Sequence, residues 1–420
     1  MKVCVIGNGG REHALAWRLS ISPSVTKVYA IPGSAAMSDC AELVGIDWQQ
    51  SDHLIRFLKD NHVDLVVVGP EAPLVVGLAD ALNAAGVPVF GPSKAAAQLE
   101  GSKVFAKDLM KKYNIPTAAY GVFHKVDEAK EFIGQTGAPI VVKADGLAAG
   151  KGVVVAMTVE EANAAVEDML SGNRFGDAGS TVVIEEFMEG EEASLLAFVD
   201  GKTVVPMIAS QDHKRIYDGD KGPNTGGMGT YAPAPVLTDA LRDEAMKTIL
   251  EPMVGAMQKK GMPYVGCLYA GLMITSQGPK VVEFNARFGD PETQVVLPLL
   301  DSDLGQIMMA CATGTLTADM VKWKDSSAAC VILASKGYPE TSSKGDVIHG
   351  DIKQHDTTIV FHSGTKLVGD EYVTNGGRVL GVVGLGKDLR TALDRAYGRI
   401  EHINFEGMQY RTDIGAKAFK

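Results

Sequence analysis

The chain has 420 residues, which is too many for one compact core, so the sequence predicts two to four domains. Its composition, 46% hydrophobic, 22% charged and 6% aromatic, is that of an ordinary globular enzyme and excludes disordered, collagen-like and disulfide-stapled chains. The formal net charge of −11 has the wrong sign for a protein that wraps nucleic acid, although it leaves local binding of small phosphates open.

The five cysteines are scattered and include no C-x-x-C pair, so neither a disulfide framework nor a zinc cage is predicted. The first residues are a short apolar run that enters a glycine turn, unlike a charged leader with a cleavage site. No run reaches the roughly 18 apolar residues of a membrane helix. We therefore expect a soluble, cytoplasmic protein with neither nucleic-acid nor membrane partners.

The first part of the chain alternates short apolar runs with amphipathic stretches. Runs that are apolar on both faces and separated by helical patterns are typical of a parallel sheet covered by helices. The sequence therefore predicts a doubly wound α/β domain over residues 1–102. Its expected strands lie at 3–6, 27–30, 65–68 and 87–90, and its expected helices at 12–20, 54–61 and 78–85.

A long helical segment over 94–113 is expected next, and Ile115-Pro116 should end it because a proline disfavours helix in the residue before it. A second domain is expected over 103–325, with an inserted α+β unit over 120–190 that forms a mobile lid. Residues 203–230 show no periodicity and are predicted to be a long functional loop. The other expected elements are strands at 139–143, 152–156, 181–186, 193–199, 267–274 and 280–284 and helices at 158–171 and 241–260.

From residue 326 onward, Val, Ile and Gly alternate in short runs, and an amphipathic stretch follows at 389–400. This pattern is typical of several short strands and one helix. A small β-rich C-terminal domain over 326–420 is therefore predicted. The whole chain is expected to be a multidomain protein of the α/β and α+β classes.

The first motif is a glycine turn, G-N-G-G-R-E-H at 7–13, between the first strand and the first helix. Glycines let a backbone approach an anion, and a helix N-terminus directs unpaired N–H groups toward it. A dinucleotide fingerprint needs a glycine at its sixth position, where this sequence has Glu12. A phosphate with Arg11 beside it is therefore favoured over a dinucleotide, and a purely structural turn is the alternative.

A second segment, Gly69-Pro70-Glu71, ends another strand of the same predicted sheet. Ligands of such sheets lie outside the carboxyl ends of the strands. Glu71 is thus placed to accept hydrogen bonds from a hydroxyl or amine of the ligand whose phosphate lies at Gly9 and Gly10. Taken alone, the segment is equally consistent with a structural turn.

The central region combines residues suited to a nucleotide. Lys103 opens a helix, Lys143 ends a strand, and the glycine-rich residues 144–152 are of the kind that closes over a triphosphate. Glu283 and Asn285 are two residues apart on a strand, so they share a face and offer the oxygen ligands that suit Mg²⁺. Each residue alone also has a structural interpretation, but their order and spacing together favour a nucleotide site.

These motifs resemble the ATP-grasp superfamily and, over essentially the whole chain, its glycinamide ribonucleotide synthetase family. R-F-G-D-P-E at 287–292 is highly specific to that family, and with residues 211–230 it separates the chain from biotin carboxylase and D-alanine ligase. The other motifs that carry the resemblance are G-N-G-G-R-E-H at 7–13, G-P-E-A-P-L at 69–74, K-A-D-G-L-A-A-G-K-G at 143–152, Q-D-H-K-R at 211–215 and G-P-N-T-G-G-M-G at 222–229.

The resemblance implies ATP-dependent ligation of glycine to 5-phosphoribosylamine in purine biosynthesis, through a glycyl phosphate, with Mg²⁺ or Mn²⁺ as the metal. It implies that Glu283 and Asn285 hold the metal. The strand before them, 268–272, has no acid, which argues against a second strongly held metal. The ATP-binding residues that it implies are Lys103 and Lys143 on the phosphates, Glu185, Glu186, Phe187 and Met188 at the adenine, and Glu192 on the ribose.

The resemblance also implies a catalytic group of Arg287, Asp290 and Lys143. Arg287 would clamp the glycine carboxylate or the transferring phosphoryl group, and Asp290 would hold an ammonium. No nucleophilic side chain is needed, because phosphoryl transfer to a carboxylate depends on positioning and charge neutralisation; His13 and His213 are expected to be hydrogen-bond partners. The implied substrate-binding residues are Asn8, Gly9, Gly10, Arg11, Glu12, Pro70, Glu71, Asp212, Thr225, Gly226, Gly227, Arg287 and Asp290.

Three alternatives remain at this level. A nicotinamide-dependent oxidoreductase is disfavoured by Glu12, and a non-catalytic nucleotide sensor is disfavoured by the intact set Lys103, Lys143, Glu283 and Asn285. A ligase of the same superfamily with a different acid or amine is excluded only by the family motifs, because periodicity and spacing do not identify a substrate.

Overall fold

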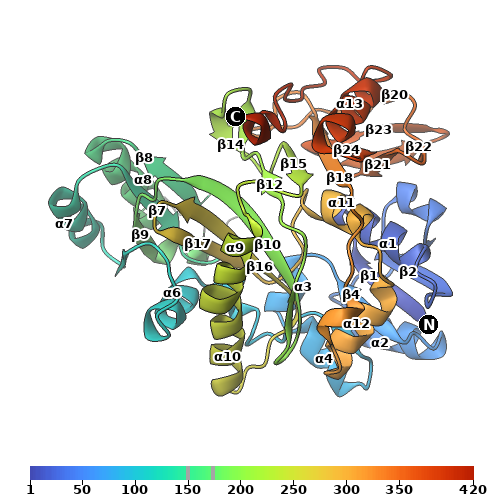
Figure 1. The fold of residues 1–420 in the computed structure, drawn as a ribbon, viewed down its shortest axis with the longest axis horizontal. Coiled ribbons are helices and arrows are strands. Elements are labelled where there is room, and N and C mark those ends of the chain that lie inside the picture. The colour runs from blue at the N-terminus through green and yellow to red at the C-terminus, as the bar shows by residue number, and fades with distance from the viewer. Residues whose placement is uncertain (148–151, 172–175) are drawn as a thin grey trace.

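The computed structural model describes residues 1–147, 152–171 and 176–420 (Figure 1). Its first sheet is parallel throughout, with the order β3-β2-β1-β4-β5. The predicted doubly wound domain is thereby confirmed. The elements are β1 (Lys2–Gly7), α1 (Gly10–Ser20), β2 (Lys27–Pro32), η1 (Ala35–Asp39), β3 (Glu42–Leu43), α2 (Ser51–Asp60), β4 (Leu65–Val68), α3 (Glu71–Val75), α4 (Leu78–Ala84) and β5 (Val89–Phe90).

Alternate residues of β1 explain why this sheet has helices on both faces. Cys4 and Ile6 pack in one core cluster with Leu54 of α2, whereas Val3 and Val5 pack in another that contains residues of α1. Successive side chains of a strand point to opposite faces, so a strand that is apolar at every position requires a cover on each side.

The predicted helix over 94–113 is wrong in two respects. It begins only at Gln98, and it is broken at Ser102 into α5 (Gln98–Gly101) and α6 (Lys103–Lys112). Ser102 has extended backbone angles, and its hydroxyl accepts a hydrogen bond from the Phe105 amide at 3.1 Å. Asp145 adds a second cap by accepting the Lys103 amide at 2.6 Å. The prediction that Lys103 opens a helix is confirmed, and both caps satisfy N–H groups that the first turn leaves unpaired.

The middle part of the chain forms two antiparallel sheets. One is the β6-β9-β7-β8 sheet, on which α7 and α8 pack, and the other is the β11-β10-β16-β17 sheet. Figure 1 shows the first at one end of the long axis and the second beside it. Their elements are β6 (Tyr120–Phe123), α7 (Val126–Thr136), β7 (Ile140–Ala144), β8 (Val153–Ala156), α8 (Val159–Ser171), η2 (Gly176–Ser180), β9 (Val182–Glu186), β10 (Glu191–Asp200), β11 (Val204–Pro206), α9 (Asp239–Ala245), the π-helical turn η3 (Met246–Leu250), α10 (Glu251–Lys259), β16 (Val265–Thr275) and β17 (Gly278–Asn285).

Residues 203–230 are not the structureless loop expected from the sequence. They contain β12 (Gln211–Asp212), the hairpin β13 (Arg215–Tyr217) and β14 (Lys221–Asn224), and the start of β15 (Gly229–Ala232). The hairpin strands are short and mostly polar, so they carry no hydrophobic alternation that the sequence could reveal. Gly219 and Gly222 have positive φ angles, which supply the conformations that the hairpin requires.

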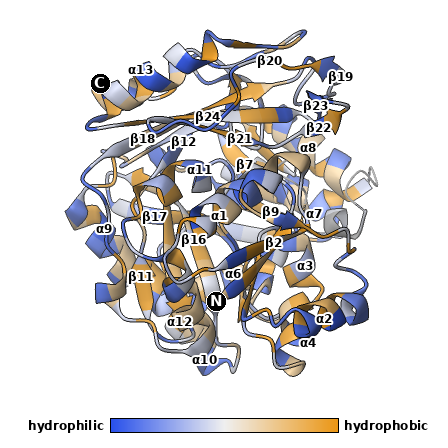
Figure 2. Cartoon of the chain, turned by 90° about the vertical axis from the view of Figure 1, so that its right-hand side faces the viewer, coloured by the Kyte–Doolittle hydropathy of each residue, from blue (hydrophilic) through white to orange (hydrophobic). Residues whose placement is uncertain are grey.

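A five-stranded sheet, β12-β15-β18-β24-β21, combines strands from residues 211–232 with strands of the C-terminal region, which also forms the smaller sheets β19-β23-β22 and β20-β25. Helix α13 packs on this five-stranded sheet. Figure 2 shows that hydrophobic strands lie inside the molecule, whereas helix α2, at the surface, is largely hydrophilic. The remaining elements are α11 (Thr293–Val296), η4 (Leu297–Leu299), α12 (Leu304–Thr313), η5 (Ala318–Met320), β18 (Ser327–Ala334), β19 (Lys344–Val347), β20 (His349–Gly350), β21 (Thr358–His362), β22 (Thr365–Val368), β23 (Glu371–Asn375), β24 (Arg378–Gly386), α13 (Leu389–Ile400), β25 (Ile403–Asn404) and η6 (Ala416–Phe419). Among the described residues, no helix is long and apolar enough to span a membrane.

Helix α1 of the first domain docks on strand β21 through buried aromatic side chains. The His362 amide donates to His13 Nδ1 at 3.0 Å, and the Phe361 ring lies edge-on to both His13 and Trp17. Because His13 Nδ1 accepts a hydrogen bond, this histidine is neutral in the folded protein. The contact brings the predicted glycine turn and the C-terminal region together.

We expect the free energy of unfolding to decrease as the pH falls from 7 to 5. Burial lowers the pKa of His13 to about 3, of His213 to about 4 and of His362 to about 4, from an ordinary value of 6.5. Between these pKa values and 6.5, the unfolded chain binds more protons than the folded protein does. The contribution of the three neutral histidines to the free energy of unfolding is therefore complete above pH 6.5 and is lost as the pH falls toward 4 and 3. Denaturant unfolding at both pH values measures the change. In a His362→Gln variant the change should be smaller, and in a variant of the exposed His53 it should match the wild type.

Candidate active site

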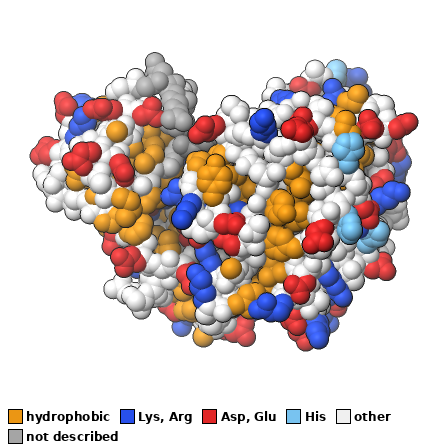
Figure 3. Space-filling view, turned by 90° about the horizontal axis from the view of Figure 1, so that it is seen from above, with side chains coloured by type: hydrophobic (Ala, Val, Ile, Leu, Met, Phe, Trp, Pro, Cys, Tyr) orange, Lys and Arg blue, Asp and Glu red, His pale blue; other side chains and the backbone are white. Residues whose placement is uncertain are grey.

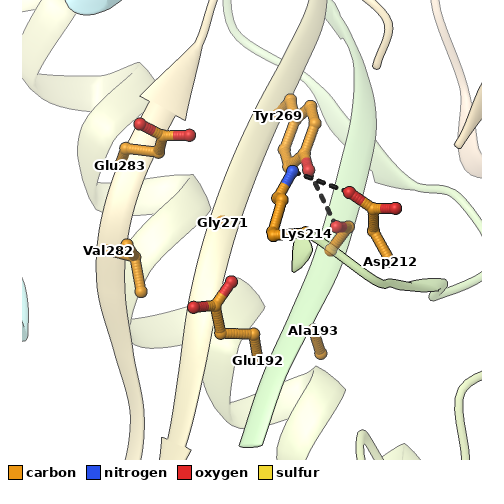
Figure 4. Close-up of a pocket in the computed structure, with 9 residues that line it drawn as sticks. Glu192, Ala193, Asp212, Lys214, Tyr269, Gly271, Val282 and Glu283 are labelled. Carbon is orange, nitrogen blue, oxygen red and sulfur yellow. Dashed lines mark hydrogen bonds and ion pairs between the residues drawn. The ribbon is translucent and has the colours of Figure 1, made fainter. Parts of the chain in front are cut away.

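One face of the β11-β10-β16-β17 sheet carries a set of polar side chains. Strand register places Ser194, Gly271 and Glu283 side by side on β10, β16 and β17, and residues two positions away share their face. This face therefore also carries the predicted residues Glu192 and Asn285. The pocket above it is lined by Glu192, Ala193, Ser194, Asp212, Lys214, Tyr269, Gly271, Val282 and Glu283 (Figure 4).

Glu283 reaches into this pocket from the edge strand β17. The surrounding protein desolvates it and would raise its pKa, but the positive charges of Lys143, Lys214 and Lys103 outweigh that effect and lower the pKa. The carboxylate is therefore ionised at neutral pH. Gly271 lies directly beside it, since a Cβ there would lie 3.4 Å from Glu283 Cγ, in van der Waals contact.

The donor atoms on β17 suit a hard divalent cation. Glu283 supplies an anionic oxygen, and Asn285 supplies an amide oxygen that receives only a long hydrogen bond, at 3.3 Å from Arg287 Nη2. Mg²⁺ is typically held by one or two protein oxygens together with substrate phosphates. Among the described residues no group of three or more His, Cys, Asp or Glu is arranged to hold a metal, so phosphate oxygens would have to complete the coordination.

The two predicted phosphate-binding lysines lie close to β17. Lys143, at the end of β7, donates to the Val282 carbonyl at 3.1 Å and lies 3.0 Å from Glu185 Oε2. Lys103, at the start of α6, donates to the Gly146 carbonyl at 3.0 Å. The charges of both ammonium groups act on Glu283, and cations in this position could neutralise the phosphate oxygens of a nucleotide.

Sequence reasoning missed Lys107, which lies one turn after Lys103 on α6. Its ammonium is 3.3 Å from Glu185 Oε2 and donates to Thr117 Oγ1 at 2.8 Å, and the side chain is almost completely buried. Burial lowers the pKa of Lys107 to about 8 despite the carboxylate beside it. The Glu185 carboxylate is therefore held by Lys107 and Lys143, and the spacing of four residues along a helix was the available signal.

A second pocket lies between the two central sheets. Glu186, Phe187 and Met188 line it from one side, and the β16–β17 turn with Lys280 lines it from the other. Seen from above, the lobe that contains β6–β9 stands apart from the body, with basic and hydrophobic side chains along the boundary (Figure 3). Strand β17 contributes to both pockets, so the predicted adenine hinge lies beside the strand that carries the predicted metal residues.

The predicted loop over 144–152 lies only partly within the described residues. Asp145 caps α6, as described above, and its neighbour Gly146 has a positive φ angle. Positions 148–151, which include Gly150 and Lys151, lie outside the described residues. Closure of this segment over a triphosphate and the mobility of the lid remain predictions.

Arg287 links the central domain to the first domain. Its Nε donates to Glu71 Oε2 at 3.2 Å, and its Nη2 donates to Glu100 Oε1 at 2.7 Å. Although burial alone would raise the pKa of Glu71, Arg287 and Arg11 lower it, and these carboxylates in turn raise the pKa of Arg287. Glu100, a buried acid whose other oxygen accepts the Ala286 amide, was not predicted.

Asp290 contacts residues from three parts of the chain. Its Oδ2 accepts the Arg11 amide at 3.3 Å, and its Oδ1 accepts the Gln294 side-chain amide at 2.8 Å. Arg378 of β24 lies 3.7 Å from Oδ1 and donates to the carbonyls of Asp290 and Gly226, each at 2.8 Å. Burial would raise the pKa of Asp290, but Arg378 and Arg11 lower it, so the group is a carboxylate.

Two further residues of this region were not predicted. Arg378 belongs to the C-terminal domain, and nothing in its local sequence separates it from a surface arginine. Gln294 is fully buried, and its Oε1 has no hydrogen-bond partner among the described residues. A buried amide oxygen without a donor is costly, so a ligand that donates a hydrogen bond there would be stabilised.

The glycine turn contacts this region closely. A Cβ at Gly10 would lie 2.3 Å from Ser363 Oγ, and one at Gly9 would lie 3.9 Å from Asp290 Oδ2. Asn8 is exposed beside them, and Pro70 precedes α3 as its N-cap. The predicted residues of 8–11 and 70–71 are therefore grouped at one edge of the parallel sheet.

Glu12 has a structural role in this turn. Its carboxylate accepts the Gly9 amide at 2.8 Å and Arg11 Nε at 2.6 Å, and the side chain is buried. A Cβ at Gly7 would lie 2.4 Å from Glu12 Cγ, and one at Gly69 would lie 2.2 Å from Glu12 Oε1. Both glycines thus leave room for Glu12, which occupies the place where a dinucleotide fingerprint has its third glycine.

The segment 211–229 contributes Asp212 and Lys214 to the lining of the first pocket. Lys214 lies 2.8 Å from Asp212 Oδ2 (Figure 4). Behind them, Thr225 Oγ1 donates to the Lys214 carbonyl at 2.8 Å. Gly227 has a φ of +120°, and a Cβ there would lie 2.8 Å from the Asp212 carboxylate. Lys214 was not among the predicted site residues although it belongs to the Q-D-H-K-R motif and faces Glu283.

Comparison with known proteins covers the whole chain. Models of the N domain, the ATP-grasp (A) domain and the C domain of phosphoribosylglycinamide synthetase match residues 1–100, 101–293 and 328–417. The chain belongs to the phosphoribosylglycinamide synthetase family. Its phosphoribosylamine–glycine ligase relatives in Halalkalibacterium halodurans and Neisseria meningitidis are 52% and 53% identical, with all of this chain and 97% and 99% of the relatives covered.

Solved structures agree with this membership. The crystal structure of phosphoribosylamine–glycine ligase from Thermotoga maritima matches with a TM-score of 0.86 at 34% identity, covering 99% of this chain and 100% of that one. The biotin carboxylase domain of a Hydrogenobacter thermophilus 2-oxoglutarate carboxylase, solved with MgADP, has a TM-score of 0.74 at 17% identity, covering 97% of this chain and 91% of that one, and so shares the fold alone. This synthetase is thus an ATP-dependent carbon–nitrogen ligase of the ATP-grasp type, a class that uses ATP and a divalent metal ion.

Proposed function

We propose that this synthetase joins glycine to 5-phosphoribosylamine in two steps. A carboxylate oxygen of glycine attacks the γ-phosphorus of ATP, ADP leaves, and glycyl phosphate forms. The amine nitrogen then attacks the carbonyl carbon, phosphate leaves, and the amide nitrogen loses a proton. The observation that carries the proposal is that the lysine- and Glu283-lined pocket adjoins the Arg287–Asp290 segment, which contacts the glycine turn of the first domain.

The nucleotide is proposed to lie along β17. Its adenine contacts the hinge of Glu185, Glu186, Phe187 and Met188, its ribose hydroxyls are held by Glu192, and its phosphates contact Lys103 and Lys143. Mg²⁺ or Mn²⁺ is held by Glu283 and Asn285 and supplies charge neutralisation at the phosphates. The remaining positive charge comes from Lys214, whose position opposite Glu283 supports a contact with the transferring phosphoryl group.

The phosphoribosylamine is proposed to lie where Asn8, Gly9, Gly10, Arg11 and Glu71 meet Asp290. Its phosphate would lie at the N-terminus of α1, where the helix dipole favours an anion. Its amine would face the Asp290 carboxylate and the unpartnered Gln294 Oε1, both of which accept hydrogen bonds. Arg287 is then placed between this substrate and the glycine carboxylate, and Asp212, Thr225, Gly226 and Gly227 line the glycine side.

The proposal keeps the sequence-based division of the chain into 1–102, 103–325 and 326–420. The 120–190 unit, which carries Lys143 and Glu185, is proposed to close as a lid, so that the acyl phosphate is shielded from water. A cytoplasmic location, where these small-molecule substrates are available, also remains a proposal.

The test is ADP release measured with each substrate omitted in turn. We expect ADP release to reach its full rate only when both glycine and 5-phosphoribosylamine are present. Glycinamide ribonucleotide should form in an amount equal to that of ADP. Full activity with another amino acid or another amine would identify a different ligase of the same fold. ATP binding without any substrate-dependent ADP release would instead indicate a nucleotide sensor.

A further inference from the structure

The last residues of the chain bind the β13–β14 hairpin, which lies within the segment 211–229. Arg411 is 1% exposed, and its guanidinium donates to Asp220 Oδ1 at 2.9 Å and to the Arg215 carbonyl at 3.1 Å. Its other nitrogens donate to both carboxylate oxygens of Asp413, at 2.7 and 2.8 Å. One buried arginine thus joins the tail to strand β13 and to the turn of the β13–β14 hairpin.

Neighbouring residues of the tail also bind the hairpin. The Thr412 amide donates to Asp218 Oδ1 at 2.9 Å, Asp413 Oδ2 accepts the Gly219 amide at 2.8 Å, and Lys417 lies 2.7 Å from Asp220. These bonds hold the tip of the hairpin, where the chain reverses. We call residues 411–417 and their contacts with 215–224 the tail clamp.

The tail clamp also reaches the base of the hairpin. The Gly415 amide donates to His213 Nε2 at 3.4 Å, so His213 Nδ1 carries the proton and donates to the Gly229 carbonyl at 3.0 Å. The His213 amide itself donates to Asp212 Oδ1 at 2.7 Å. Both ring nitrogens are therefore occupied, which assigns this histidine to positioning.

The hairpin needs such support. A two-stranded hairpin is at best marginally stable by itself. Ile216 is buried in it, whereas Tyr217, Asp218 and Lys221 are exposed, so little apolar surface is removed from water. Its two ends are Lys214 and Thr225, which are bonded to each other and carry the substrate-facing part of the segment.

We propose that the tail clamp, centred on Arg411, is a positioning device that holds Lys214 and Asp212 in the geometry needed for acyl transfer. The inference rests on the proposed function, because it takes Lys214 and Asp212 to face the transferring phosphoryl group and glycine. A residue almost 200 positions away along the chain thereby controls the reacting groups, although it touches no substrate. A displacement of about 1 Å is enough to cost on the order of a hundredfold in rate.

The experiment compares Arg411→Met and Arg411→Lys with a matched control, Arg399→Met. Arg399 lies on α13 of the same domain and also bridges an aspartate, Asp351, and two carbonyls, but it lies outside the tail clamp. We expect Arg411→Met to lower kcat/KM for glycine by at least about tenfold while the Kd of a non-hydrolysable ATP analogue stays within twofold. Arg411→Lys should recover part of the loss, since lysine keeps the charge without the planar fork, and Arg399→Met should change neither constant.

Hydrogen exchange provides the second readout. Amides of 215–224 should exchange at least about tenfold faster in Arg411→Met and at the wild-type rate in Arg399→Met. A folded Arg411→Met protein with wild-type kinetics and wild-type exchange would overturn the proposal, and so would an equal loss of ATP-analogue affinity. If Arg411→Met does not fold, the variant to test is Asp220→Asn, at the exposed tip of the hairpin. We expect its kcat/KM for glycine to fall and its hairpin exchange to rise in the same way but only about threefold. Unchanged kinetics and exchange in Asp220→Asn would also overturn the proposal. Failure of the substrate-omission test on the wild type would refute the proposed function instead, while the exchange result would still test the tail clamp.

Discussion

Replacing Glu283 by glutamine should lower kcat by more than about a hundredfold, the effect typical of removing one electrostatic contact to a transition state. The change removes one negative charge at nearly constant volume. The charges of three lysines lower the pKa of this carboxylate below its ordinary value of 4.5, so the wild-type group is ionised at neutral pH. Glutamine therefore weakens metal binding at the phosphates and leaves the cations around the pocket without their shared counterion.

Steady-state kinetics at saturating Mg²⁺, together with the thermal midpoint, measures the effect. The fold should be retained, because Glu283 lies at the edge strand β17 and its side chain is open to the pocket. Glu340→Gln, on an exposed loop, is the matched control and should keep the wild-type kcat. A near-normal kcat for Glu283→Gln would show that the metal is held elsewhere.

The parallel sheet was predictable because its signal is local. Strand β4 reads Leu-Val-Val-Val over 65–68 and is buried at every position. A run that is apolar on both faces needs a cover on each face, and the amphipathic stretches before and after it provide one. Sequence pattern and tertiary environment agree throughout this domain, so the fold class followed from periodicity.

The errors in the predicted elements have equally local causes. A helical pattern continues through 94–113, but the Ser102 hydroxyl and the Asp145 carboxylate compete successfully for the amides at 103–105. Asp145 is more than forty positions away, so half of this cap depends on the tertiary fold. The β13–β14 hairpin was missed for another reason, because its strands are polar and the tail clamp stabilises it instead of a hydrophobic face.

The residues of the candidate site fall into two groups. Those that share a short motif, such as Glu283 with Asn285 or Gly9 with Gly10, could be predicted to lie together from their spacing alone. Lys107, Glu100 and Arg378 were missed, since each acquires its role only when another segment packs against it. Arg378 is the clearest case, because β24 brings it to Asp290 from 88 residues away.

The charge of Asp290 is the second feature on which activity should depend strongly. Asp290→Asn should lower kcat/KM for 5-phosphoribosylamine by about a hundredfold, on the scale of one lost electrostatic contact, while the Kd of an ATP analogue changes little. Asp290 lies at the first-domain side of the site, and the proposed nucleotide lies along β17 at the other side. This single variant should therefore separate the binding of 5-phosphoribosylamine from the binding of ATP.

The physical reason is that both carboxylate oxygens of Asp290 face donors. Oδ2 accepts the Arg11 amide, and Oδ1 accepts the Gln294 amide and faces Arg378. An asparagine must turn its NH₂ group toward one of these donors, and it no longer offers a negative charge to a substrate amine. Since Arg378 and Arg11 lower the pKa of the aspartate, the wild-type kcat/KM should show no loss from this group until the pH falls below its ordinary value of 3.8.

Kinetics with 5-phosphoribosylamine varied at saturating ATP and glycine measures the effect, and Asp325→Asn on the surface is the matched control. The result also tests the assignment of Gln294, whose Oε1 lies next to the same site and has no hydrogen-bond partner in the part of the chain that the structure describes. If the amine is held by both groups, Gln294→Met should raise the KM for 5-phosphoribosylamine in the same direction but by less, because it removes a neutral acceptor and leaves the charge. An Asp290→Asn variant that lost ATP affinity as strongly as amine affinity would mean that Asp290 organises the whole site, and the separation into a nucleotide side and an amine side would have to be abandoned.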